Sequence, residues 1–102
     1  MSTDFSITTF SDQTKQACDF LRILGNENRL YILCLLIEHG EMSVGQIHTM
    51  TTLSQSALSQ HLAKMRDEGL VNYRRQSQTL YYYICDDKVA RILMTLKEIF
   101  CP

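Results

Sequence analysis

The sequence predicts a mainly helical α+β fold, a winged helix-turn-helix, in which a β-hairpin follows a short helix and a longer one. Two observations predict it. Apolar residues recur at helical spacing through most of the chain, whereas residues 71–84 change to alternation and β-forming residues. The chain has 102 residues, so these elements belong to one domain, which we place over residues 12–102.

An amino-terminal arm and one helix are expected first. Residues 1–11 show no clear period, which predicts a flexible arm. Residues 12–24 present apolar side chains on one helical face, with Ser11 or Asp12 as the N-cap and Gly25 at the end.

The second helix begins after the N-cap Asn26 and ends before Gly40. It is apolar most of the way round, so we expect it to be the buried central helix. Its apolar stripe places Cys34 beside three aliphatic residues, Leu30, Leu33 and Ile37.

A helix-turn-helix is expected next. Ser43 begins a short helix, and Ser54 caps a longer one over residues 54–68 that ends at Gly69. Three apolar residues turn one face of the longer helix toward the core: Leu58, Leu62 and Met65.

The alternating segment predicts a hairpin wing over residues 71–84, with its turn near Ser77 and Gln78. The turn lacks the usual glycine, which leaves its length open. Alternation places Tyr82 on the opposite face from Tyr81 and Tyr83, and packing of these aromatic rings on the core is favoured over base stacking.

The last helix is expected over residues 86–100, capped by Asp86 and Asp87. Its apolar face, like that of residues 12–24, has no obvious partner within the chain. Both faces therefore suit a symmetric homodimer interface.

The composition excludes several classes of protein. Hydrophobic residues make up 45% and charged residues 21%, which is ordinary globular usage. The longest apolar run, residues 31–37, is far shorter than the roughly 20 residues of a membrane-spanning helix, and no signal peptide is apparent. We expect a soluble cytoplasmic protein with reduced cysteines and no cofactor. With no catalytic triad, carboxylate pair or phosphate loop, an enzyme is not expected.

The helix at residues 54–68 carries the strongest functional signal. Its solvent side combines hydroxyls, amides and one cation, which are groups that contact base edges and phosphates in the major groove. The helix N-terminus can also hold a phosphate. The candidate DNA-contacting residues are Ser54, Gln55, Ser56, Ser59, Gln60, His61 and Lys64. A merely solvated helix face is the alternative, although such faces more often use Glu and Lys.

The wing offers a second set of contacts. Residues 53–84 carry four Lys/Arg and two Asp/Glu (+2), whereas residues 1–52 carry three and six (−3), in a chain of net charge −1. We expect three wing residues to contact the DNA backbone or the minor groove: Arg74, Arg75 and Gln78. A basic hairpin exposed only to solvent is the alternative.

The chain resembles the ArsR/SmtB family of bacterial repressors over residues 14–101. The resemblance rests on motifs in the family's order: Leu24-Gly-Asn-Glu-Asn-Arg-Leu30, Ser43-Val-Gly-Gln-Ile47, Leu53-Ser-Gln-Ser-Ala-Leu-Ser-Gln-His-Leu62 and Arg66-Asp-Glu-Gly-Leu-Val71. It implies a homodimer joined by its first and last helices. Such a dimer binds a pseudo-palindromic operator in double-stranded DNA and releases it on sensing an inducer.

The family's two familiar metal sites are absent from the sequence. Arsenic and cadmium sensors have a cysteine pair where this chain has Ser43 and Gly45, which cannot replace thiolates on a soft metal. Zinc sensors use Asp and His on the last helix, but Lys88 and Ile99 stand where histidines are needed. We expect no metal site.

Two cysteines resemble those of the persulfide-sensing, BigR-like branch of this family: Cys34 in Ile32-Leu33-Cys34 and Cys101 in Ile99-Phe100-Cys101-Pro102. The resemblance implies that this dithiol reacts with a persulfide or polysulfide inducer, forms a polysulfide or disulfide bridge, and releases DNA to derepress sulfide-handling genes. Cys18 and Cys85 do not match the pattern and are interpreted as bystanders.

The residues themselves also allow a plainer interpretation of the dithiol. A cysteine on an apolar stripe is usually a small hydrophobic residue, and nothing nearby in the sequence activates either thiol. A plain disulfide requires Cα atoms about 4.4–6.8 Å apart, whereas inserted sulfur atoms relieve the strain of a longer span. Two alternatives therefore stay open: a redox-insensitive or peroxide-responsive regulator of virulence genes that acts against a silencer, and a protein-interaction module that does not bind DNA.

Overall fold

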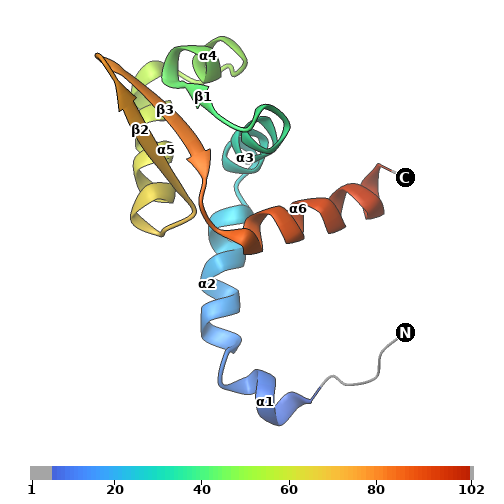
Figure 1. Cartoon of the computed structure of the whole chain (residues 1–102). Coiled ribbons are helices and arrows are strands. Elements are labelled where there is room, and N and C mark those ends of the chain that lie inside the picture. Colours follow the sequence, from blue (N-terminus) through green and yellow to red (C-terminus); the bar gives the residue numbers. More distant parts are fainter. Residues whose placement is uncertain (1–5, 102) are drawn as a thin grey trace.

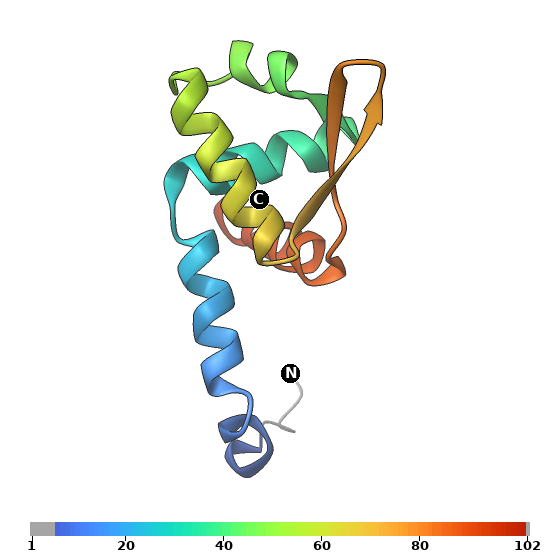
Figure 2. The same ribbon diagram turned by 90° about the vertical axis from the view of Figure 1, so that its left-hand side faces the viewer.

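The computed structural model describes residues 6–101, which form six helices and a three-stranded antiparallel sheet (Figure 1). The elements are α1 (Ile7–Ser11), α2 (Thr14–Leu24), α3 (Glu27–His39), β1 (Met42–Ser43), α4 (Val44–Thr49), α5 (Gln55–Asp67), β2 (Val71–Gln76), β3 (Thr79–Ile84) and α6 (Asp87–Phe100). The wing and α4 lie at one end of a body measuring 49 × 30 × 22 Å, and α1 lies at the other (Figures 1 and 2). Within residues 6–101 no helix has the length and apolarity needed to cross a bilayer.

The hydrophobic core lies where α3 and α5 meet the sheet. The fully buried side chains are Ile32, Leu33, Leu36, Ile47, Leu58, Leu62, Met65, Leu70, Val71 and Val89. The prediction of a buried central helix is confirmed by α3, which contributes three of these residues. The prediction for Cys34 is wrong, because the core face of α3 is formed by residues 32, 33, 35 and 36 and leaves Cys34 exposed.

Side-chain caps begin most helices where the sequence predicts them. Asn26 accepts the backbone N–H of Arg29 at 3.1 Å at the start of α3, and Ser54 accepts that of Ala57 at 3.1 Å at the start of α5. Ser43 and Gln46 form a reciprocal capping box at α4. Asp86 alone caps α6, accepting the N–H of Lys88 at 2.9 Å, while Asp87 lies in the first turn.

The amino-terminal prediction needs correction. Part of the arm expected at residues 1–11 forms the short helix α1, capped by Ser6, whose Oγ accepts the N–H of Thr9 at 3.4 Å; residues 1–5 lie outside the described residues. Neither Ser11 nor Asp12 caps the next helix. Ser11 is the last residue of α1, and α2 starts after Gln13 without a side-chain cap.

The sheet contains one strand that the sequence does not predict. β2 and β3 form the expected hairpin, and the pairing of Gln76 with Thr79 defines a two-residue turn in which Ser77 has a φ of 59°. β1 adds to the other edge of β3 by pairing Met42 with Tyr82. Two residues are too few to show alternation, so β1 has no sequence signal.

Gly69 provides a test of the junction between α5 and β2. Its φ of +80° lies in the left-handed region, whereas Gly45 sits in α4 with ordinary helical backbone. We expect G69A to lower the free energy of unfolding by about 1 kcal/mol because of backbone strain. The control G45A should raise it by about 0.5 kcal/mol, since alanine favours a helix. Urea unfolding measures both, and equal effects would contradict the conformational argument.

Candidate nucleic-acid interface

The two helices α4 and α5 form the helix-turn-helix, and burial orients the second of them. Leu58, Leu62 and Met65 are almost completely buried, so the opposite face of α5 points to solvent. Six of the predicted contact residues are exposed on α5 or at its N-cap: Ser54, Gln55, Ser56, Ser59, Gln60 and Lys64. These side chains form what we call the recognition face.

His61 differs from the other predicted contact residues because it is half-buried and bonded to α3. Its Nδ1 accepts a hydrogen bond from Nε–H of Arg29 at 3.0 Å. Arginine is only a donor, so Nδ1 must be unprotonated and the proton of neutral His61 lies on Nε2. Burial, and secondly the charge of Arg29, lower the pKa of His61. The imidazole is therefore a neutral, oriented donor at neutral pH.

The two arginines of the wing have different surroundings. The guanidinium of Arg74 is bound by the carboxylate of Glu41, with Nη2 2.6 Å from Oε1 and Nε 3.1 Å from both oxygens. This contact lowers the pKa of Glu41. Arg75 is exposed, and within residues 6–101 its side chain has no hydrogen bond, ion pair or ring contact. Gln78 is exposed in the turn.

Of the three tyrosines of β3, only Tyr82 packs on the core as the sequence predicts; Tyr81 and Tyr83 are half-buried outside the core. Tyr82 is buried, with its ring centroid 5.3 Å from that of Tyr73. The guanidinium of Arg66, from the end of α5, lies 4.4 Å above the Tyr73 ring. Tyr81 faces the other side of the hairpin, where the Arg74 guanidinium stacks on it at 4.5 Å.

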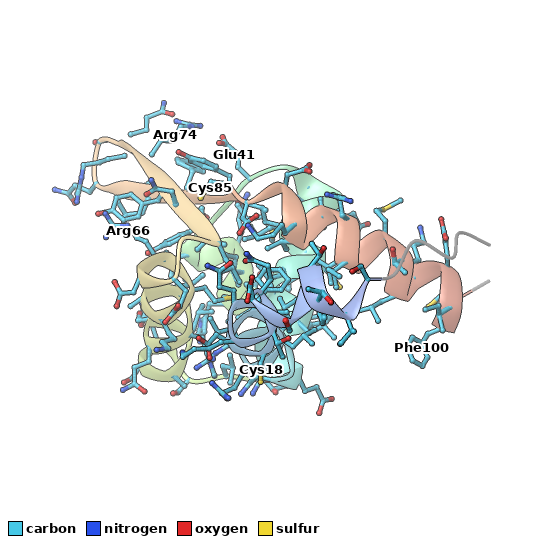
Figure 3. All side chains as sticks on the ribbon, turned by 90° about the horizontal axis from the view of Figure 1, so that it is seen from below. Cys18, Glu41, Arg66, Arg74, Cys85 and Phe100 are labelled. Atoms are coloured by element: carbon cyan, nitrogen blue, oxygen red, sulfur yellow. The ribbon has the colours of Figure 1, made fainter. Side chains whose placement is uncertain are left out.

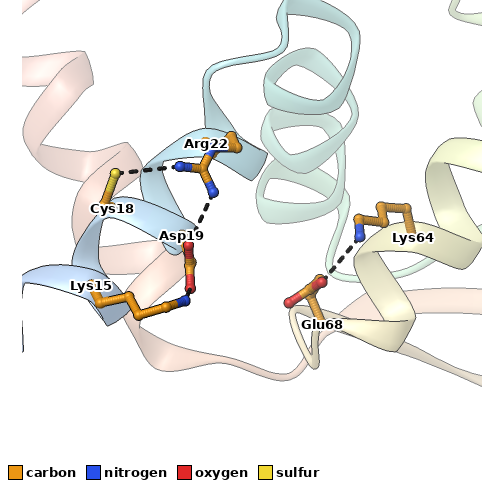
Figure 4. A network of polar contacts seen from close by, with 6 residues as sticks. All are labelled: Lys15, Cys18, Asp19, Arg22, Lys64 and Glu68. Carbon is orange, nitrogen blue, oxygen red and sulfur yellow. Dashed lines mark hydrogen bonds and ion pairs between the residues drawn. The ribbon is translucent and has the colours of Figure 1, made fainter.

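One residue of the recognition face, Lys64, and three residues of α2 form ion pairs (Figure 4). Lys64 forms an ion pair with Glu68 at 3.2 Å. Across from it on α2, Asp19 binds both Lys15 at 2.8 Å and Arg22 at 3.0 Å. These pairs are exposed, so each contributes little to stability.

All four cysteines are free and exposed. Cys34 lies on α3, and Cys101 is the C-cap of α6, where its N–H donates to Lys97 O at 2.7 Å. Partial burial and the charge of Cys101 raise the pKa of the Cys34 thiol, so the two side chains are within electrostatic reach of each other.

The other two thiols are engaged elsewhere. Cys18 Sγ accepts from Nη2 of Arg22 at 3.6 Å, and Cys85 Sγ donates to Gly69 O at 3.4 Å. Figure 3 shows Cys18 and Cys85 well separated from each other. No group of three or more His, Cys, Asp or Glu side chains within residues 6–101 is placed to hold a metal ion.

Comparison with known proteins identifies the family. Residues 26–73 match the arsR family of bacterial regulatory proteins. The HTH-type transcriptional regulator YgaV of Escherichia coli is 43% identical over 88 residues, covering 86% of this chain and 89% of that protein. The chain belongs to the arsR family. ArsR-family members are DNA-binding transcriptional regulators and not enzymes, so those two predictions are confirmed.

Of two further relatives, one is named as an activator and the other as a repressor. The transcriptional activator HlyU of Vibrio cholerae is 43% identical over 86 residues, covering 84% of this chain and 79% of that protein. The crystal structure of the transcriptional repressor BigR from Xylella fastidiosa superimposes with a TM-score of 0.89 at 30% identity, covering 96% of this chain and 99% of that one. The predicted winged helix-turn-helix fold is confirmed.

Sequence reasoning missed the residues that hold the interface in place. Arg29 and Glu41 contact residues more than 30 positions away, and a single sequence does not show such pairings. Arg66 contacts Asn72 and Tyr73 nearby in the chain, but only across the turn from α5 into β2. The motif around residues 24–30 includes Arg29, but nothing in it indicates a bond to His61.

The Arg29–His61 contact generates a test by NMR titration. We expect R29A to raise the pKa of His61 toward its ordinary value of about 6.5, because it removes a nearby cation and admits water. In the wild type, the folded state favours neutral His61. This contribution to the free energy of unfolding is fully present above the pKa that His61 has in the unfolded chain, and it declines as the pH falls below that value. The matched control R22A should leave the His61 titration unchanged. The same pKa in R29A and wild type would refute the contact.

Proposed function

We propose that this ArsR-family regulator binds operator DNA as a homodimer and releases it when Cys34 and Cys101 of one protomer become bridged by reactive sulfur. The observation that carries the sulfur response is the placement of two exposed thiols, one on α3 and one at the C-cap of α6. The raised pKa of Cys34, to which the charge of Cys101 contributes, agrees with this placement. Membership of the ArsR family supports DNA binding in general, and the two thiols support a response to reactive sulfur.

For DNA binding, we assign the recognition face and His61 to base edges and phosphates of the major groove. Its hydroxyls and amides suit base contacts, and the free backbone N–H groups at the N-terminus of α5 suit a phosphate. Arg75 and Gln78, exposed on the wing, are assigned to the backbone or minor groove. Two recognition helices of a dimer would meet half-sites about 34 Å apart.

For dimerisation, we assign the apolar surface of α1, α2 and α6 to a second copy of the chain. Large hydrophobic side chains are exposed there, at Phe10 (39%), Leu21 (56%), Met94 (52%), Ile99 (62%) and Phe100 (75%). A cleft of about 480 Å³ also separates α2 from α6 and is lined by Ala17, Phe20 and Ile92. A soluble monomer rarely leaves so much apolar surface uncovered.

Leu21 tests the dimer interface. We expect L21E to weaken self-association by at least about tenfold, because a glutamate would be buried without a partner. The control M50E changes an equally apolar, exposed side chain (45%) at the C-cap of α4, away from α2 and α6, and should leave the mass unchanged. Sedimentation equilibrium measures both. A monomeric wild type, or an L21E variant that dimerises as well as wild type, would contradict this interface.

The proposed sulfur chemistry balances with the persulfide as both sulfur donor and oxidant. The Cys34 thiolate takes the outer sulfur of one RSSH and releases RSH. The resulting persulfide attacks the inner sulfur of a second RSSH, which releases H₂S. Cys101 then displaces RSH to close the bridge. In sum, two thiols and two RSSH give one trisulfide, two RSH and one H₂S. The thiolate is the nucleophile, and the raised pKa of Cys34 leaves little thiolate at neutral pH. The first step should therefore become faster as the pH increases.

Bridging would connect two elements that control DNA binding. α3 packs beneath α5 through the core and carries Arg29, which binds His61. α6 belongs to the proposed dimer surface. A bond from Cys34 to Cys101 therefore couples the orientation of α5 to the angle between protomers, and couplings of about 1–3 kcal/mol are typical of such switches.

Intact-mass spectrometry tests the dithiol. After treatment with glutathione persulfide, we expect wild type to gain sulfur and lose two hydrogens, with the bridge mapped to Cys34 and Cys101, and to lose affinity for a duplex enriched from a random pool. C34S and C101S should keep their DNA affinity under the same treatment. The control C18S/C85S should respond like wild type.

Parallel treatments separate the alternatives. A bridge formed equally by hydrogen peroxide would favour a peroxide-responsive regulator. Failure of every reagent to link these cysteines would refute the sensing proposal and leave a redox-insensitive DNA-binding protein.

A further inference from the structure

Every nitrogen of the Arg74 guanidinium donates a hydrogen bond within the protein. Besides its fork on Glu41, its Nη1 donates to Oε1 of Gln76 at 2.9 Å, and its plane stacks on Tyr81. The carboxylate therefore occupies the Nε–Nη2 edge of the guanidinium, Gln76 engages Nη1, and the Tyr81 ring covers one face, which together limit the N–H groups left for a phosphate. Only about half of the side chain is accessible (47%).

Glu41 brings a distant part of the chain to the wing. It lies between Gly40, which ends α3, and Met42, the first residue of β1. Figure 3 shows Glu41 and Arg74 together on one side of the hairpin and Arg66 on the other. The ion pair thus joins the edge strand β2, across β3, to the segment between α3 and β1. We call Glu41, Arg74 and Tyr81 the wing latch.

Arg75 is the matched counterpart. Successive side chains of a strand point to opposite faces, so Arg75 points away from the latch. Its guanidinium is exposed and, among the described residues, binds nothing. It can therefore approach a phosphate without first breaking an internal contact.

We propose that Arg74 is a positioning residue rather than a DNA contact: the wing latch holds the hairpin in its DNA-binding orientation and leaves Arg75 to contact the backbone. This inference rests on DNA binding as proposed above, and it corrects the equal roles that the sequence suggested for the two arginines. The geometry of the Arg74 contacts carries it, and the lowered pKa of Glu41 agrees with an ion pair that persists at neutral pH.

A rival arrangement predicts the opposite sign. If Glu41 merely masked Arg74 until DNA displaced it, E41Q would free a cation, tighten binding and steepen its salt dependence. If the latch positions the wing, E41Q weakens binding even though it removes a negative charge near DNA. Simple electrostatics also predicts tighter binding, so a loss of affinity is specific to the latch.

The experiment measures binding of each variant to a duplex enriched by wild type from a random pool, over a range of salt concentrations. We expect E41Q to bind about fivefold more weakly, with no steeper salt dependence. The control E38Q removes an exposed acid of α3 that has no hydrogen bond or ion pair within residues 6–101, and should not bind more weakly than wild type. R75Q should reduce the slope of log K against log salt by about 1.8 for two phosphate contacts per dimer.

A charge swap completes the test. R74E alone should bind poorly, and E41R/R74E should regain most of the lost affinity, because it restores the ion pair while removing the cation from position 74. An E41R/R74E variant that binds DNA as weakly as R74E, or an E41Q variant that binds as tightly as wild type, would overturn the latch.

Hydrogen exchange separates the latch from DNA binding itself. Without DNA, the amides of β2 should exchange faster in E41Q than in wild type and E38Q, because the outer strand is less firmly held. Unchanged exchange would overturn the latch whatever the DNA result. A wild type that enriches no duplex would refute operator binding instead, and the exchange would still decide the latch.

Discussion

The arrangement of this molecule depends on burying one side of α5. Leu58, Leu62 and Met65 insert between α3 and the sheet, and close packing leaves their helix one orientation. That orientation exposes the opposite side, where hydroxyls and amides are concentrated. It also fixes the start of the wing, because Leu70 and Val71 continue into the same core. Rotation of α5 about its axis would expose apolar surface and bury amides together, so the recognition face is a direct product of the core.

Polar contacts around this core connect the recognition face and the wing to the rest of the fold. His61 is held by Arg29 at the start of α3, and the wing is held by Arg66 on one face and by Glu41 through Arg74 on the other. Most of these side chains are half-buried or exposed, so their contribution to stability is small. Their effect is on geometry: they restrict how basic groups can turn toward a ligand.

Periodicity and caps predicted most of the fold because they act locally. Asn26, Ser43 and Ser54 cap where expected, and the change of period located the hairpin. Contacts between distant segments were not predictable. β1 exists only because β3 offers it an edge, and nothing near Arg74 in the sequence points to a carboxylate at Glu41.

The candidate site shows the same division. The recognition face followed from helical spacing, and the two thiols followed from resemblance to a family. The exposure of Cys34 could not be predicted, because α3 is apolar on nearly every side and spacing alone did not show which side meets the core. Solvent reaches the side opposite Ile32 and Leu36, and that is decided by how α6 and the sheet pack around the helix.

The long separation of the two thiols along the chain has a consequence for turnover of the protein. A bond from Cys34 to Cys101 would close a ring over residues 34–101, which contains nearly every element of the fold except α1 and α2. Closing so large a loop restricts the unfolded chain and adds about 4 kcal/mol of stability in the chain-entropy model. The bridged form would then unfold less often and present fewer cleavable segments to cellular proteases. The bridged protein would then outlast the reduced protein that is not bound to DNA, and its return to the reduced form would require a reductant.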